Sequence, residues 1–183
     1  MAKSIIKGIV LILIVAVVTL VGGAYLLPPE ARVSRAKVIN ASPEQIFAIA
    51  GNLRRFNEWS PWASLDPETV YRFEGPDQGG VGQKMSWASN DPNVGKGTQT
   101  ITELVPNQKI VTDVDFGEMG QSLSTMTLQP ADGGTLVTWD FQAKLDGVMN
   151  RWMGLMFDRL IGGDYEKGLS NLESVVEKEA AGD

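Results

Sequence analysis

An uncharged apolar run close to the N-terminus constrains this chain more than any other feature. From Gly8 to Leu27 there are 20 residues without a charge, dominated by Ile, Val and Leu. At about 1.5 Å per helical residue, the run spans roughly 30 Å, the thickness of the hydrocarbon core of a bilayer. Pro28 and Pro29 then end the helix. Because the run is apolar on every face, it predicts a single transmembrane helix rather than a buried core helix.

Residues 1–29 have two interpretations. They form either a retained membrane anchor or a cleaved signal peptide, with the small residues Gly22 and Ala24 at the processing site. The uncharged run is long for a signal peptide, and the fit at Gly22 and Ala24 is mediocre. These two points favour the anchor.

The orientation of this segment depends on the charges that flank it. Lys3 and Lys7 favour a cytoplasmic N-terminus, whereas three basic residues soon after the span oppose that orientation. A very short N-terminal tail ahead of a large domain is typical of a signal anchor. We therefore expect a single-pass membrane protein whose domain, residues 30–183, lies outside the cytoplasm.

Composition restricts the chemistry of the domain. The chain has no His and no Cys, which excludes a Ser-His-Asp triad, a thiolate nucleophile, a disulfide framework and metal sites built on His or Cys. No carboxylate cluster has the spacing of a metal-binding loop. Residues 30–183 carry 14 basic and 22 acidic groups, a net charge of about −8, which argues against nucleic-acid binding and against tight docking on anionic lipid. We expect no metal, no cofactor and no nucleic-acid partner.

The pattern after residue 30 predicts strands, two short helices and more strands. Residues 31–39 alternate weakly, as a strand does. Ser42-Pro-Glu-Gln45 then combines an N-cap serine, a proline at the first helical position and a glutamine three residues after the cap. A second short helical turn is expected at 53–58. Period-two runs separated by turns rich in Gly, Pro, Asn and Asp predict an antiparallel meander. These runs lie at 69–74, 81–89, 96–105, 108–116, 121–129 and 134–145.

Three of these strands have one apolar face each, so the sheet needs a cover on one side. The faces are Val81, Met85 and Trp87; Ile110, Val114 and Phe116; and Val137, Trp139, Phe141 and Ala143. The cover is the C-terminal segment, in which apolar residues recur at helical spacing over about thirty residues from Met149 to Val176. Gly162-Gly163 is expected to kink this long helix. The predicted class is α+β, a sheet of about seven strands curled around one long helix.

This order of elements resembles the helix-grip fold of the SRPBCC superfamily, and local motifs strengthen the resemblance. Ser42-Pro-Glu-Gln-Ile-Phe47 is similar to the helix start that follows strand one. Asn57-Glu-Trp-Ser-Pro-Trp62, followed by Asp66-Pro67, is similar to a segment of the polyketide cyclase/dehydrase-like branch. Other similar stretches are Val81-Gly82 with Trp87, Gly95-Lys-Gly97 with Ile101, Thr135-Leu-Val-Thr-Trp139 and Lys167-Gly-Leu-Ser-Asn-Leu172. The resemblance covers roughly residues 31–178. It implies a cavity between sheet and helix that usually binds hydrophobic ligands, but no single reaction.

We expect a hydrophobic small molecule or lipid to bind in that cavity. Methionines on the long helix suit a flexible apolar lining, although ordinary core packing also explains each of them. Trp59 and Trp62 form either a lid at the cavity mouth or a structural plug. The predicted ligand-binding residues are Trp59, Trp62, Met85, Trp87, Val114, Phe116, Trp139, Phe141, Met149, Trp152, Met153, Met156, Phe157 and Tyr165.

Two further hypotheses belong to other functional classes. An enzyme of the polyketide cyclase/dehydrase type needs a polar group inside the cavity that moves a proton. The weak candidates are Glu103 and Asp164, which stands beside Tyr165 on the long helix. Alternation with Ile101 and Val105 points Glu103 inward, where it is either a ligand anchor or a residue at the sheet edge. The third hypothesis is a non-catalytic interaction scaffold at the membrane. The sequence identifies no protein partner.

Overall fold

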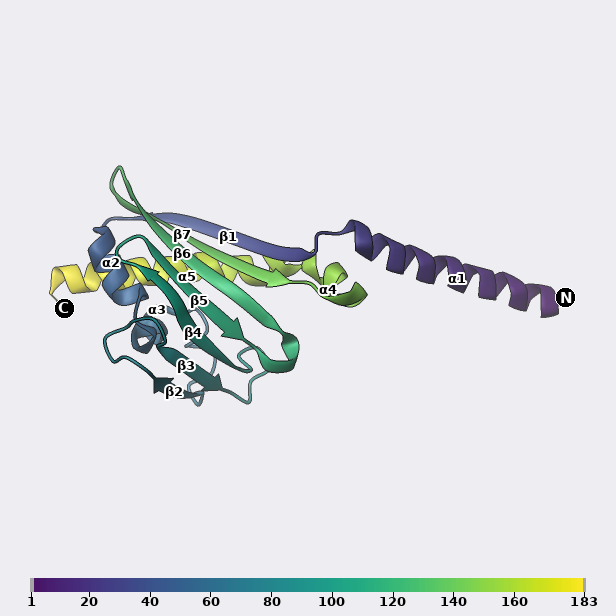
Figure 1. The fold of residues 1–183 in the computed structure, drawn as a ribbon, viewed down its shortest axis with the longest axis horizontal. Helices are drawn as coiled ribbons and strands as arrows, with labels where there is room; N and C mark the ends of the chain where they lie inside the picture. Colours follow the sequence, from purple (N-terminus) through teal and green to yellow (C-terminus); the bar gives the residue numbers. More distant parts are fainter. Residues whose placement is uncertain (1, 183) are drawn as a thin grey trace.

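A long N-terminal helix projects from the rest of the molecule in the computed structural model, which describes residues 2–182 (Figure 1). This helix, α1, spans Ala2–Leu26, and its described side chains from Ile5 to Gly22 are exposed. The stretch Ile5–Leu26 is long and apolar enough to cross a membrane. The expected apolar helix is therefore present, and by length and composition it suits a membrane span or a signal sequence.

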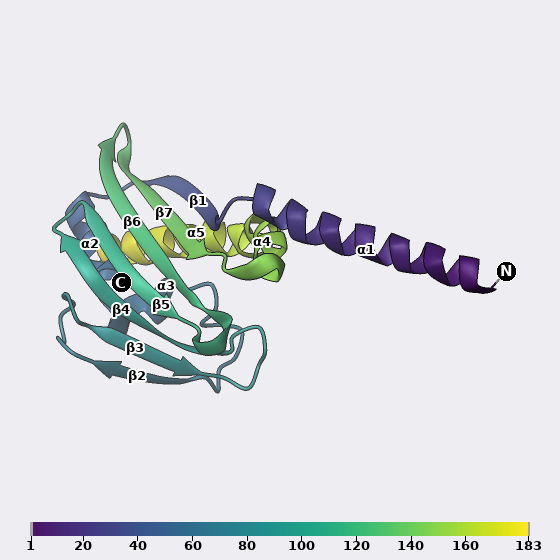
Figure 2. The ribbon, with the colours of Figure 1, turned by 45° about the vertical axis from the view of Figure 1, so that its right-hand side comes forward.

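Seven antiparallel strands form one curled sheet (Figures 1 and 2). The strands are β1 (Glu30–Ile39), β2 (Val70–Glu74), β3 (Lys84–Ala88), β4 (Lys96–Val105), β5 (Lys109–Asp115), β6 (Gln121–Ala131) and β7 (Gly134–Lys144). Their order is β1-β7-β6-β5-β4-β3-β2, so β1 and β2 are the edges. The meander of β2 to β7 follows from the short turns between them, and β1 joins its far side by pairing Glu30 with Lys144 and Ile39 with Thr135.

Short helices fill the connection between β1 and β2. Helix α2 (Pro43–Ala50) begins at a full capping box, in which the Ser42 hydroxyl accepts from the amide of Gln45 and the Gln45 side chain accepts from the amide of Ser42. The 3₁₀ turn η1 (Leu53–Arg55) and helix α3 (Phe56–Trp59) follow. A second 3₁₀ turn, η2 (Gly117–Met119), joins β5 to β6. These elements match the helix expected to begin at Ser42 and the helical turn expected at 53–58.

The C-terminal segment forms two helices, α4 (Gly147–Gly154) and α5 (Phe157–Ala181), rather than one. Helix α5 lies across the sheet (Figure 1) and buries Tyr165, Leu169, Leu172 and Val176 against it. These positions are spaced by three, four and seven residues, which places them on one helical face. The α+β helix-grip architecture predicted from the sequence is therefore confirmed.

Two local predictions are wrong. The helix breaks at Leu155–Met156, and Gly162-Gly163 lies inside α5. A Cβ atom on Gly162 would lie 2.1 Å from the Arg35 guanidinium, so this glycine allows β1 to approach the helix closely. Val81, expected on the apolar face of a strand, is exposed in the turn before β3, because this strand begins only at Lys84.

Candidate functional site

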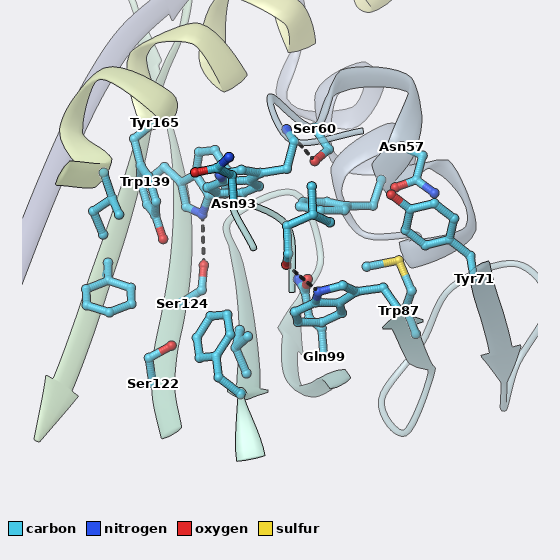
Figure 3. A pocket seen from close by; sticks show the side chains of 18 residues that line it. Asn57, Ser60, Tyr71, Trp87, Asn93, Gln99, Ser122, Ser124, Trp139 and Tyr165 are labelled. Carbon is cyan, nitrogen blue, oxygen red and sulfur yellow. Dashed lines mark hydrogen bonds between the residues drawn. The ribbon is translucent and has the colours of Figure 1, made fainter. Parts of the chain in front are cut away.

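A cavity of about 200 Å³ lies between the sheet, α3 and α5 (Figure 3). It occupies the half of the sheet from which α1 and α4 emerge. The register shows this, because Trp87, Phe116 and Ser122 lie near strand ends that share an edge with the Glu30–Lys144 pair. The lining residues are Phe56, Asn57, Ser60, Trp62, Tyr71, Met85, Trp87, Asn93, Val94, Gln99, Val114, Phe116, Ser122, Ser124, Trp139, Phe141, Ile161 and Tyr165.

Aromatic rings form two walls of the cavity. On one side, the Trp139 and Tyr165 rings stack with centroids 4.0 Å apart, and Trp62 meets Trp139 edge-on at 6.2 Å. On the other side, Trp87 and Phe116 meet edge-on at 5.9 Å. Such paired rings keep one another in place and present a rigid apolar surface. The cavity is therefore held open by stacked and edge-on contacts on two sides.

The polar side chains of the lining are all uncharged, and several of them are hydrogen-bonded to other residues of the domain. The Trp139 indole N–H donates to the Ser124 hydroxyl at 2.8 Å, and the Gln99 amide donates to the Thr112 hydroxyl at 3.3 Å. The Ser122 hydroxyl is buried and has no hydrogen-bond partner among residues 2–182. A buried hydroxyl without a partner loses about 1–3 kcal/mol of solvation. Ser122 is therefore a buried group of the lining, described by the structure, with unused hydrogen-bonding capacity.

The lining carries no charged side chain. Among its described residues, Tyr71 and Tyr165 are the only ones with a titratable group. Burial raises the pKa of both phenols, most strongly that of Tyr165. Both therefore stay protonated and neutral at physiological pH. No group of three or more acidic side chains suited to a metal ion occurs within the part of the chain that the structure describes.

Eight of the fourteen residues predicted to bind ligand line this cavity, and two more support its wall. The eight are Trp62, Met85, Trp87, Val114, Phe116, Trp139, Phe141 and Tyr165. Trp59 is 3% exposed and meets Trp139 edge-on at 5.1 Å, which makes it a packing residue rather than a lid. Phe157 stacks on Phe141 at 5.5 Å. Ligand contact by the eight lining residues stays a prediction.

Met149, Trp152, Met153 and Met156 lie outside the cavity, contrary to their expected place in its wall. Because the helix breaks at Leu155–Met156, this segment turns away from the sheet and packs beside α1. The Trp152 indole N–H donates to the carbonyl of Leu20 at 3.0 Å. The four side chains are between 37% and 67% exposed.

Neither weak catalytic candidate reaches the cavity. A β-bulge between Ile101 and Glu103 reverses the alternation of β4. Glu103 consequently points to solvent and pairs with Lys109 at 2.8 Å, while Leu104 packs on the core. Asp164 is not a lining residue. Its carboxylate accepts a hydrogen bond from the Trp62 indole at 3.1 Å and so fixes one aromatic wall.

Several lining residues were not singled out from the sequence, although a signal for them exists. In β6, Ser122 and Ser124 share the inward parity of Met126 and Leu128, all four of which are buried. Two small polar residues at the inward positions of a strand, next to large apolar ones, indicate a place where the core is not filled. Tyr71, by contrast, stands in a short edge strand without a clear pattern.

Comparisons with known proteins support the fold. Residues 30–177 match the family model described as polyketide cyclase / dehydrase and lipid transport. No curated protein matches the sequence. Among solved structures, protein SA2116 of Staphylococcus aureus, described as of unknown function, is 12% identical with a TM-score of 0.64, covering 83% of this chain and 96% of that chain.

Two other solved structures are similar. A putative uncharacterized protein of Rhizobium leguminosarum is 20% identical with a TM-score of 0.58, over 81% of this chain and 95% of that chain. The di-domain aromatase/cyclase StfQ of the steffimycin biosynthetic pathway is 12% identical with a TM-score of 0.60, over 83% of this chain and 52% of that chain. At these identities, the likeness shows the fold alone.

Proposed function

This chain belongs to the polyketide cyclase / dehydrase and lipid transport family, and we propose that it is a membrane-anchored domain that binds one small, neutral, hydrophobic molecule in the cavity beneath α5. The observation that carries the proposal is a mainly apolar lining, rich in aromatic rings and without a single charged side chain. The absence of charge narrows the predicted hydrophobic ligand to neutral molecules.

The size of the cavity limits the ligand. An apolar cavity of about 150 Å³ holds benzene, and pockets for drug-sized molecules begin at about 300 Å³. A volume of about 200 Å³ lies between the two. It suits a ligand of about one or two rings, or a short aliphatic chain, rather than a whole phospholipid.

The chemistry of the lining limits the charge of the ligand. A carboxylate or ammonium group without a partner is strongly disfavoured in an apolar cavity, since desolvation is not offset. The Ser122 hydroxyl offers a neutral hydrogen bond instead. A ligand with one hydroxyl or carbonyl oxygen would satisfy it. Because the lining lacks a group that changes its charge near neutral pH, the observations favour binding over proton-transfer chemistry.

The test uses the five tryptophans of the chain as reporters. Full-length protein labelled with 5-fluorotryptophan, in phosphatidylcholine nanodiscs, is titrated with 2-naphthol, naphthalene and 2-naphthoate and followed by ¹⁹F NMR. We expect Trp62, Trp87 and Trp139 to shift saturably while Trp152 on α4 does not. Affinity should fall in the order naphthol, naphthalene, naphthoate.

Substitution of Ser122 separates the hydrogen bond from the shape of the cavity. Ser122→Ala should weaken naphthol binding by about 2- to 10-fold, the value of one neutral hydrogen bond, and leave naphthalene unchanged. Ser34→Ala, on the exposed face of β1, is the matched control. Equal affinity for naphthoate and naphthol would contradict the proposal that the cavity prefers neutral ligands. If the three cavity tryptophans respond to none of the probes, the binding proposal fails.

We also propose that α1 is retained as a membrane anchor and that the domain lies outside the cytoplasm. Its exposed apolar stretch and the contacts of Trp152 and Arg151 with its last turns support retention, and the short tail carrying Lys3 and Lys7 supports the orientation. Intact mass spectrometry of the membrane fraction should find residues 1–29 still attached. A C-terminal alkaline phosphatase fusion in a bacterial host should be active, whereas a cleaved or inverted chain would contradict the anchor or its orientation.

A further inference from the structure

Six apolar side chains form an exposed patch over α4 and the start of α5, which we call the α4 surface. They are Met149, Trp152, Met153, Leu155, Met156 and Leu160, each between 37% and 67% exposed. None of the eight residues of α4 is buried. Large exposed apolar side chains gathered on one short segment mark a surface that another phase or partner covers.

Contacts with α1 fix where this surface lies. The Trp152 indole N–H donates to the Leu20 carbonyl at 3.0 Å, and a Cβ atom on Gly23 would lie 3.0 Å from the Trp152 ring. The Arg151 guanidinium lies 5.2 Å from the centre of the Tyr25 ring. Helix α4 is therefore held beside the last turns of α1, at the end of the apolar span.

The residue types suit the boundary between hydrocarbon and headgroups. Trp and Tyr concentrate there because their rings are apolar and their N–H or O–H groups remain near water. Arginine keeps its stem in the apolar layer and its guanidinium among the headgroups. A short helix with apolar residues on one side lies flat at this depth.

We propose that the α4 surface inserts into the interfacial layer of the bilayer beside α1. The inference rests on the proposed anchoring by α1, because that helix brings the surface to the membrane. Continuity with α1 argues for lipid as the occupant rather than a second copy of the chain. The net charge of about −8 on the domain means that burial of apolar area, and not attraction to anionic lipid, drives the insertion.

The placement has a consequence for the ligand cavity. The cavity occupies the half of the sheet nearest to α1, as the pairs Glu30–Lys144 and Ser122–Ala143 show. Insertion of the α4 surface therefore holds that half of the sheet against the membrane. On this proposal, the cavity end of the sheet faces the bilayer, and a hydrophobic ligand dissolved there is close to the domain.

The absence of cysteine in the chain allows single-site labelling in the full-length protein. Three variants, Val15→Cys in α1, Met153→Cys in the α4 surface and Asp132→Cys in the distant turn between β6 and β7, each carry an NBD fluorophore. They are placed in phosphatidylcholine vesicles with and without lipids brominated on the acyl chain, which quench only fluorophores inside the bilayer. We expect strong quenching at position 15, at least threefold more quenching at 153 than at 132, and less than twofold change when anionic phosphatidylglycerol is added.

The outcomes separate the two proposals. Quenching at 15 with position 153 equal to 132 overturns insertion of the α4 surface and leaves the anchor intact. No quenching at 15 overturns the anchor and this inference with it. A signal at 153 that depends on protein density but not on bromolipid identifies a second copy of the chain as the occupant, which also overturns the inference. Stronger quenching at 153 than at 132 that appears only in the bromolipid vesicles supports insertion of the α4 surface.

Discussion

Helices α4 and α5 are neighbours in the sequence, yet they place their apolar residues in opposite surroundings. Helix α5 buries Leu169, Leu172 and Val176 against the sheet, and ion pairs tie it to β1. Helix α4 buries none of its residues and contacts α1. The comparison teaches that apolar residues at helical spacing show that a face requires a cover, but not whether protein or lipid supplies it.

The largest expected effect comes from a substitution on the buried face of α5, Leu172→Ala. The Leu172 side chain has no exposed surface. Loss of the transferred methyl groups and the cavity left behind should lower the free energy of unfolding by about 2–5 kcal/mol. Urea unfolding of the full chain in detergent micelles, followed by near-UV circular dichroism, measures it. Leu155→Ala, on the α4 surface, is the matched control and should change stability by less than about 0.5 kcal/mol; equal losses would contradict the contrast.

Two glycines of α5 sharpen the comparison between the covered and uncovered sides of one helix. A Cβ atom on Gly168 would lie 2.6 Å from the Trp139 ring, whereas one on Gly163 meets nothing within 4 Å. Gly168→Ala should destabilise by about 1–3 kcal/mol through overpacking. Gly163→Ala should stabilise by about 0.5–1 kcal/mol, because alanine restricts the unfolded chain and favours the helix. The same unfolding assay decides, and stabilisation by both variants would show that Trp139 moves freely.

The smallest expected effect concerns the ion pairs that hold α5 to β1. Arg35 contacts Asp158 at 2.8 Å and Glu166 at 2.7 Å. The hydrogen bond from Arg35 lowers the pKa of Asp158 below its ordinary value. Its carboxylate therefore stabilises the folded state above the ordinary aspartate pKa of about 3.9, and this contribution disappears as the pH falls through the lowered value.

Removal of the Asp158 carboxylate tests whether it contributes to the loss of stability at low pH. In Asp158→Asn, the fall in stability between about pH 5 and pH 2 should be slightly shallower than in the wild type. Asp132→Asn, in the exposed turn between β6 and β7, provides the comparison curve. Thermal unfolding across this pH range supplies the measurement, and a steeper fall in Asp158→Asn would contradict the assignment. The effect stays small because Asp158 is largely exposed and screened.

The sequence predicts the sheet well because alternation and turn residues are local signals. Val137, Trp139, Phe141 and Ala143 are buried along β7 as their parity requires. Glu103 was misplaced because the bulge after Ile101 shifts parity without a glycine or proline to mark it. Such a shift is decided by pairing with β5, which alternation within one strand does not report.

The candidate site is less predictable because it depends on where the helix breaks. The residues at the break, Leu155 and Met156, are good helix formers, while Gly162-Gly163 continues the helix. Helix α4 contacts α1 through Trp152, whereas α5 packs on the sheet, so the break separates two segments with different partners. Helix propensity carries no information about either contact. The sequence pattern therefore places the methionines of α4 in the cavity wall, where the structure does not have them.

The pairing of β1 with β7 also has a consequence for synthesis of the chain. β1 leaves the ribosome first among the strands, and its partner β7 leaves last, since Glu30 pairs with Lys144. Until then, β1 has no partner strand. The sheet is complete only after a contact of high sequence separation has formed, and such contacts form slowly. Arg32, Arg35 and Lys37 place charges along this strand, and charged side chains keep an open strand from pairing with other chains. We therefore expect the basic residues of β1 to limit its pairing with other chains until β7 is available.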